Sequence, residues 1–163
     1  MRLSRVALVG VFFIAIPGFA GSTGDWQQYT DKVLQVTFRY PKEWKPSPAY
    51  SDRTYFGGPD GAVQLSAAGD DTPQHGCQSA VTHHLQPFGS HPRIRSLKIQ
   101  GQKACLVWPS GEQGANADAE LFVEFPQPVE IDGNRYNQLT LYADKNHILE
   151  IVKTLRFLSR PSR

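Results

Sequence analysis

The sequence predicts an α+β fold in which two amphipathic helices cover an antiparallel sheet. Short segments with alternating apolar and polar residues are separated by Gly and Pro at close intervals, a pattern typical of strands joined by tight turns. Such connections pair neighbouring strands antiparallel. Two other segments repeat apolar residues with helical spacing, which indicates helices packed on the sheet through one face.

The clearest strand covers residues 34–40 and ends at Pro41. Its odd and even positions differ strictly in polarity, so one face is expected to be buried. The expected buried face consists of Leu34, Val36, Phe38 and Tyr40.

Three hairpins and one further strand are expected after it. The hairpins span residues 53–69, 93–109 and 129–143, with turns at Pro59–Gly61, Gln100–Gly101 and Asp132–Asn134. In the first turn, proline fixes φ and Gly61 is expected to take a positive φ. The further strand covers residues 119–125 and is expected to end at Pro126 and Pro128.

The first helix is expected to begin with Thr72 as its cap and Pro73 in its first turn, and to end before Pro87. Its apolar face would consist of Cys77, Ala80, Val81, His84 and Leu85.

The second helix is expected to have Asp144 as its cap, and Phe157 and Leu158 would fix the segment that follows it. Its apolar face would consist of Ile148, Ile151, Val152 and Leu155.

The first twenty residues have the layout of a secretory signal peptide. Arg2 and Arg5 precede an apolar run, Pro17 interrupts it, and small residues lead to a cleavage site after Ala20. An uncleaved N-terminal anchor is the alternative, although the run is short for a membrane span. We therefore predict a signal peptide over 1–20, a single domain over 21–163, and a secreted or periplasmic location.

Cys77 and Cys105 are predicted to form a disulfide. An exported chain enters an oxidising compartment, where two cysteines usually pair. The bond would join the first helix to the sheet. Two free buried cysteines are the alternative.

The charge balance excludes two classes of partner. Cleavage after Ala20 would leave 15 basic and 15 acidic residues, a net charge near zero. Nucleic acid requires a basic face, and anionic lipid requires a Lys/Arg cluster. We expect neither nucleic-acid binding nor a stable membrane anchor after cleavage, but a protein or small-molecule partner outside the cytoplasm.

The histidine-rich segment is the strongest candidate for chemistry. His75, His83, His84 and His91 lie close together in sequence, but no pair has the i, i+4 spacing that places two zinc ligands on adjacent turns. The chain also lacks a G-x-S-x-G motif and a P-loop. We therefore predict no catalytic residues, no metal site and no cofactor.

Aromatic residues give the remaining signal. Trp44, Tyr50, Tyr55 and Phe56 lie in one loop and hairpin region, and together they could form an exposed interaction surface. Core packing is the alternative, because aromatic side chains usually supply core area.

Both ends of the chain resemble the PsbP-like family. The resemblance rests on "YTDKVLQVTFRYPKEWK", with its F-x-Y-P-x-x-W motif, and on "YNQLTLYADKNHILEIVKTLRFL". The middle segment, "LQPFGSHPRIRSLKIQGQKACLVWPSGEQ", looks like a branch of small exported bacterial proteins. The resemblance implies an α/β/α sandwich, an antiparallel sheet between helices. It implies no specific activity, because PsbP-like proteins perform unrelated functions on this scaffold, and no site residue transfers.

The sequence thus predicts an exported, non-catalytic accessory or partner-binding domain. One alternative is a small secreted hydrolase or metal-dependent enzyme that uses the histidine-rich helix. Another is a structural subunit of an envelope or pigment complex, which would expose a large apolar patch.

Overall fold

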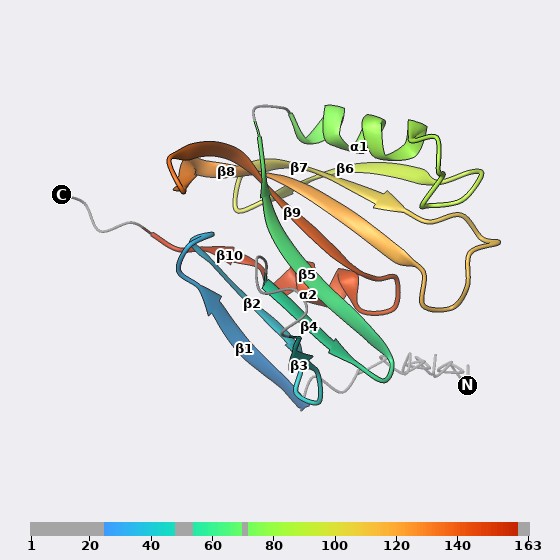
Figure 1. The fold of residues 1–163 in the computed structure, drawn as a ribbon, viewed down its shortest axis with the longest axis horizontal. Coiled ribbons are helices and arrows are strands. Elements are labelled where there is room, and N and C mark those ends of the chain that lie inside the picture. Colours follow the sequence, from blue (N-terminus) through green and yellow to red (C-terminus); the bar gives the residue numbers. More distant parts are fainter. Residues whose placement is uncertain (1–24, 48–53, 70–71, 160–163) are drawn as a thin grey trace, which may run out of the picture.

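The computed structural model describes residues 25–47, 54–69 and 72–159. Ten strands and two helices lie in these ranges (Figure 1). In chain order they are β1 (Trp26–Asp31), β2 (Val36–Pro41), β3 (Lys45–Pro46), β4 (Thr54–Gly58), β5 (Gly61–Ala68), α1 (Pro73–Thr82), β6 (Arg93–Ile99), β7 (Gln102–Trp108), β8 (Asp118–Ile131), β9 (Asn134–Asp144), α2 (Ile148–Thr154) and β10 (Arg156–Phe157). The predicted signal peptide lies outside the described residues.

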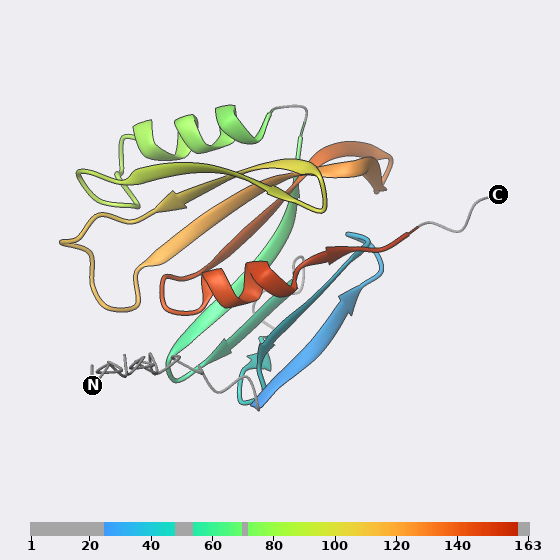
Figure 2. The same cartoon turned by 180° about the vertical axis from the view of Figure 1, so that it is seen from behind.

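The strands form two sheets, and all the pairings between them are antiparallel, as predicted. The larger sheet has seven strands in the order β3-β4-β5-β9-β8-β7-β6, and the smaller has three in the order β1-β2-β10. Figure 2 shows α2 between the two sheets, while α1 lies on the opposite face of the larger sheet.

The predicted fold class was wrong. More than half of the described residues lie in strands, so the protein is a sheet-rich, two-sheet fold and not a helix-flanked α/β/α sandwich. The reason is that β1, β2 and β10 form a separate sheet where the prediction placed a helical layer. The seven residues of α2 fill only part of the space between the sheets.

The main core lies between the two sheets and includes the buried side of α2. Alternation along the strands separates this core from a smaller one beneath α1. On β7, for example, Ala104 and Leu106 contribute to the main core, whereas Cys105 and Val107 contribute to the smaller core. The larger sheet is therefore buried on both faces where α1 covers it.

Strand β2 and the hairpin turns confirm the local predictions. The four predicted inward residues of residues 34–40 are all buried. Gln100, Gly101, Asp132 and Gly133 have positive φ angles of 49°, 84°, 50° and 77°, as tight hairpin turns require.

Gly61 departs from its predicted role. The positive-φ residues of the described chain do not include Gly61, which instead begins β5. A Cβ atom at this position would lie 2.1 Å from Oδ2 of Asp144. Glycine is therefore required here by the close approach of a carboxylate and not by the turn.

Helix α1 begins as predicted, since Oγ1 of Thr72 accepts a hydrogen bond from the backbone N–H of His75 over 3.3 Å. It ends at Thr82, earlier than expected, and leaves Leu85 72% exposed beyond it.

Helix α2 begins at Ile148, and its cap position is His147 and not the predicted Asp144. The Asp144 carboxylate accepts a hydrogen bond from the backbone N–H of Asn146 over 3.0 Å, in the turn before the helix. The predicted apolar residues Ile148, Ile151 and Leu155 are fully buried.

The predicted disulfide is present. The sulfur atoms of Cys77 and Cys105 are 2.08 Å apart and join α1 to β7 inside the smaller core. Within the described ranges, none of the helices combines the length and apolarity needed to cross a bilayer.

Candidate functional site

The candidate site is a polar groove on the face of the larger sheet that also holds α1. The helix packs over β6, β7 and β8 and leaves the parts of this face on β4, β5 and β9 uncovered. A groove of about 570 Å³ lies on this part of the face. Its lining residues are Tyr55, Ala62, Gln64, Ser66, Ala67, Ala68, Asp118, Thr140 and Tyr142.

Strand register aligns three polar residues of the groove with the buried Glu120 beside it. Glu120 on β8 lies opposite Tyr142 on β9, Tyr142 lies opposite Gln64 on β5, and Gln64 lies opposite Tyr55 on β4. Directly opposed residues share a face of a sheet, so these four side chains form one row across four strands.

A second row of the groove carries two hydroxyl groups. Thr140 lies opposite Ser66, and their side-chain oxygens are 2.7 Å apart. The Thr140 hydroxyl is also 3.3 Å from the backbone oxygen of Ser66, to which it can donate a hydrogen bond. These contacts hold the two hydroxyls in fixed positions beside the first row.

Glu120 stands at the inner end of the first row and is only 3% exposed. Its burial raises the pKa of the carboxyl group to about 7, and a hydrogen bond from the Tyr142 hydroxyl opposes part of that rise. Burial and the neighbouring Glu120 also raise the pKa of Tyr142, which therefore stays a hydrogen-bond donor at neutral pH. Burial, and then the nearby carboxylate of Asp144, raise the pKa of Asp118.

Glu120→Gln is expected to change how stability depends on pH. Between pH 4.5 and about 7, the folded state binds a proton at Glu120 that the unfolded state has released. The free energy of unfolding therefore falls as the pH rises through this window, by about 3 kcal/mol at most. The glutamine variant does not lose stability in this way. Its free energy of unfolding, relative to that of the wild type, should therefore be higher at pH 8 than at pH 5.

Urea denaturation at pH 5 and pH 8 would measure this difference, with Glu130→Gln at the exposed end of β8 as the matched control. An equal difference between wild type and Glu120→Gln at both pH values would contradict the assignment.

A second polar cluster surrounds His147, which sequence reasoning missed. Its Nδ1 lies 2.9 Å from the buried carboxylate of Asp144, and its Nε2 lies 3.3 Å from Oδ2 of Asp60. The indole of Trp44 packs edge-on against the imidazole and donates a hydrogen bond to Asp60 over 2.7 Å. Both ring nitrogens therefore face carboxylates, which suits a structural link between the β4–β5 turn and α2 better than a catalytic base.

A third cluster joins two loops through Glu112. Its Oε1 accepts hydrogen bonds from the hydroxyls of Ser90 and Ser110, each over 2.6 Å, and from the backbone N–H of Ser90 over 2.7 Å. The hydrogen bonds from Ser110 and then Ser90 lower the pKa of Glu112 to about 2. A carboxylate with a pKa this low is a weak base, so the arrangement suits a structural link between the two loops better than activation of either serine.

The residues predicted as an interaction surface occupy different places. Trp44 and Phe56 are buried in the main core, whereas Tyr55 borders the groove. Tyr50 lies outside the described residues. Core packing, the alternative considered for these aromatics, therefore describes Trp44 and Phe56.

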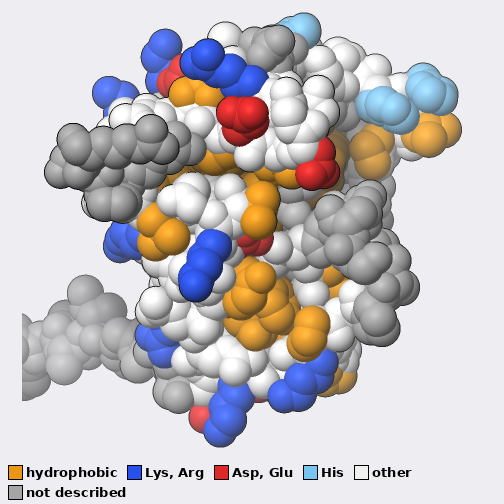
Figure 3. Space-filling view, turned by 60° about the vertical axis from the view of Figure 1, so that its left-hand side comes forward, with side chains coloured by type: hydrophobic (Ala, Val, Ile, Leu, Met, Phe, Trp, Pro, Cys, Tyr) orange, Lys and Arg blue, Asp and Glu red, His pale blue; other side chains and the backbone are white. Residues whose placement is uncertain are grey.

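The histidine-rich segment lies apart from the groove. His83 and His84 are exposed beyond the end of α1 with their rings stacked 4.7 Å apart, and Figure 3 shows histidine side chains gathered at one edge of the molecule. Within residues 25–47, 54–69 and 72–159, no three His, Cys, Asp or Glu side chains are grouped so as to hold a metal ion.

Neither a protein-family model nor a curated protein matches this sequence. A solved structure that it resembles is the solution structure of cyanobacterial PsbP (CyanoP) from Synechocystis sp. PCC 6803. The two share 12% sequence identity with a TM-score of 0.42, over 88% of this chain and 98% of that chain. At this TM-score the likeness carries no argument about family or function.

Proposed function

We propose that the protein is a non-catalytic binding domain that works outside the cytoplasm and holds a small, hydroxyl-rich molecule in the groove. The observation that supports this proposal best is the position of the Gln64 amide between Tyr55 and Tyr142 on the open sheet face, with the hydroxyls of Ser66 and Thr140 beside it. A groove of about 570 Å³ has the size typical of small-molecule sites.

The lining favours a neutral polyol, such as one or two sugar units. The Gln64 amide can donate and accept hydrogen bonds, as sugar hydroxyls do. The Ser66 and Thr140 hydroxyls bond to each other and keep lone pairs that can accept hydrogen bonds from sugar hydroxyls. The rings of Tyr55 and Tyr142 offer apolar faces for the C–H surface of a ring. The lining residues include no Lys or Arg, so an anionic ligand would lack a countercharge next to Asp118.

Two further observations support the cellular location and the absence of catalysis. A disulfide in this fold is typical of proteins in oxidising compartments, and it accompanies the leader predicted at residues 1–20. Neither His147 nor Ser110 lines the groove, and each bonds to a carboxylate that links two parts of the fold.

The test is a titration of ¹⁵N-labelled protein with glucose, galactose, cellobiose, maltose and myo-inositol, followed by amide chemical shifts. We expect shifts confined to β4, β5 and β9 for at least one of these compounds. Gln64→Ala should weaken that binding at least tenfold, whereas the exposed Gln127→Ala, outside the groove, should not.

No groove-centred shifts with any of the five compounds would contradict the proposed ligand class. Conversion of a bound compound to a product would instead show that the protein is an enzyme.

A further inference from the structure

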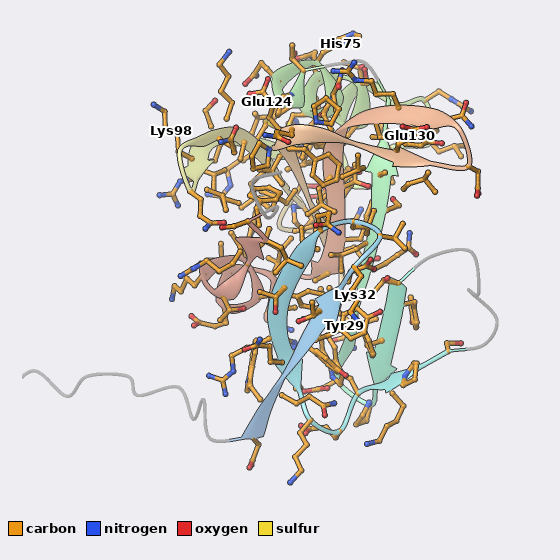
Figure 4. All side chains as sticks on the ribbon, turned by 90° about the vertical axis from the view of Figure 1, so that its left-hand side faces the viewer. Tyr29, Lys32, His75, Lys98, Glu124 and Glu130 are labelled. Atoms are coloured by element: carbon orange, nitrogen blue, oxygen red, sulfur yellow. A yellow bond between two sulfur atoms is a disulfide. The ribbon has the colours of Figure 1, made fainter. Side chains whose placement is uncertain are left out.

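The free edge of the larger sheet carries a basic cluster that the fold itself does not require. We call it the β6 edge and define it as Arg93, Arg95 and Lys98 on β6 with Lys103 on β7. All four side chains are exposed, and the strand order ends at β6, so its outer side pairs with no other described strand. Figure 4 shows Lys98 on this hairpin, pointing away from the rest of the molecule.

Two of these charges oppose one another directly. Lys98 and Lys103 are register partners in the β6–β7 hairpin. Like charges at directly opposed positions destabilise a sheet. Arg93 and Arg95 share the other face of β6, because residues two apart in a strand point the same way.

None of the ion pairs among the described residues involves this cluster. The sequence has no Asp or Glu from Arg93 to Gly111. On β8, Glu124 follows Val123, which is the register partner of Ala104 on β7. Within the described residues, Glu124 forms no ion pair with Lys103. The cluster thus carries four cations, of which only Lys103 has an acidic residue, Glu124, across from it in register, in a chain whose overall charge is only +2.

Protection of the edge against aggregation explains only part of this arrangement. Charged side chains on an edge strand discourage pairing with identical chains. Lys103, however, lies on the inner strand β7, where protection does not require it. Of the two edge strands of the smaller sheet, β1 has no Lys or Arg, whereas β10 carries Arg156.

We propose that the β6 edge binds an extended acidic segment of a partner protein as an added strand. The outward N–H and C=O groups of β6 would pair with the segment's backbone. Carboxylates at alternate positions of the segment all point to one side of it and would face Arg93 and Arg95. This surface is separate from the groove and does not depend on the proposed ligand.

The probe is an acetylated and amidated octapeptide of alternating Glu and Val, with a Lys/Val peptide of the same length as its counterpart. The Glu peptide should bind, and alternate β6 amides should gain protection from hydrogen exchange in the complex. Arg93→Glu/Arg95→Glu should weaken binding at least tenfold. Arg135→Glu, an exposed charge on β9, should change it less than twofold.

A Glu peptide N-methylated at alternate residues separates strand addition from simple charge attraction. Methylation should abolish binding, because it removes the backbone donors while keeping every carboxylate. Equal binding of the methylated peptide, or no binding of the parent peptide, would overturn the proposal. So would attraction of the β6 edge to phosphatidylglycerol vesicles with no peptide binding, which would identify an anionic membrane surface as the partner.

Discussion

Replacing Trp44 by alanine is expected to lower the free energy of unfolding by about 3–5 kcal/mol. Trp44 is 0% exposed and is the largest fully buried side chain in the described chain. Its loss would leave a cavity beside Gly58 and Gly61, where backbone packs closely against the indole. It would also remove the donor to Asp60, whose carboxylate helps to hold His147.

Urea denaturation of the purified variant would measure this effect. Trp26→Ala is the matched control, because Trp26 is only half-buried and packs at the margin of the core, so its loss should cost much less. Trp44→Phe separates the two contributions, since it keeps much of the ring volume but loses the hydrogen bond. Equal losses for Trp44→Ala and Trp26→Ala would contradict the placement of Trp44 in the core.

Removal of the disulfide by Cys77→Ala/Cys105→Ala is expected to cost about 3–4 kcal/mol of stability. The bond closes a loop with a sequence separation of 28 residues, and its loss increases the conformational freedom of the unfolded chain. Both half-cystines are buried with Phe88, Val107 and Phe122, so the smaller core would also lose packing. The main core contains neither cysteine and should remain intact.

Denaturant unfolding combined with hydrogen exchange would test this distinction. The backbone amides of α1 should exchange much faster in the variant, whereas those of α2 and the centre of β9 should exchange at rates set by global unfolding. The wild type treated with reductant provides a control without any change in sequence. Unchanged protection of α1 would contradict the role of the bond in attaching this helix.

The local structure was largely predictable, because its signals lie within a few residues. Thr72 and Pro73 mark the start of α1, and the alternation over residues 34–40 marks a buried strand. Short polar turns likewise located the hairpins at Gly101 and Gly133. Each of these features is set by the backbone preferences of the residues that form it.

The fold class was not predictable, because it depends on pairings between distant residues. Strand β10 has two residues and is defined by its register with Thr37 and Val36 on β2, which no local pattern indicates. Proline was also misleading in β8. The strand continues through Pro126 and Pro128, because a register irregularity between Glu124 and Val129 interrupts the ladder with β9 there.

The candidate site was missed for the same reason. Gln64, Glu120 and Tyr142 are unremarkable in sequence, and only the order of the strands brings them into one row. His147 lies outside the histidine-rich segment, so the sequence pattern did not indicate a polar cluster there. Its spacing from Asp144 was a usable signal, because a carboxylate three residues before a helix-terminal histidine can reach the ring.

The smaller sheet cannot be completed until its last strand in chain order, β10, has been synthesised. The backbone N–H of Arg39 donates a hydrogen bond to the Thr154 hydroxyl, 115 residues away, and β10 completes a sheet begun by β1 and β2. Synthesis proceeds from the N-terminus, so β1 and β2 are made long before β10. Until β10 is present, they can form only a two-stranded hairpin. Such high contact order slows folding and prolongs the exposure of unpaired edges. During that delay the apolar face of β2 would be available to chaperones, and a chain truncated before α2 could not close its main core.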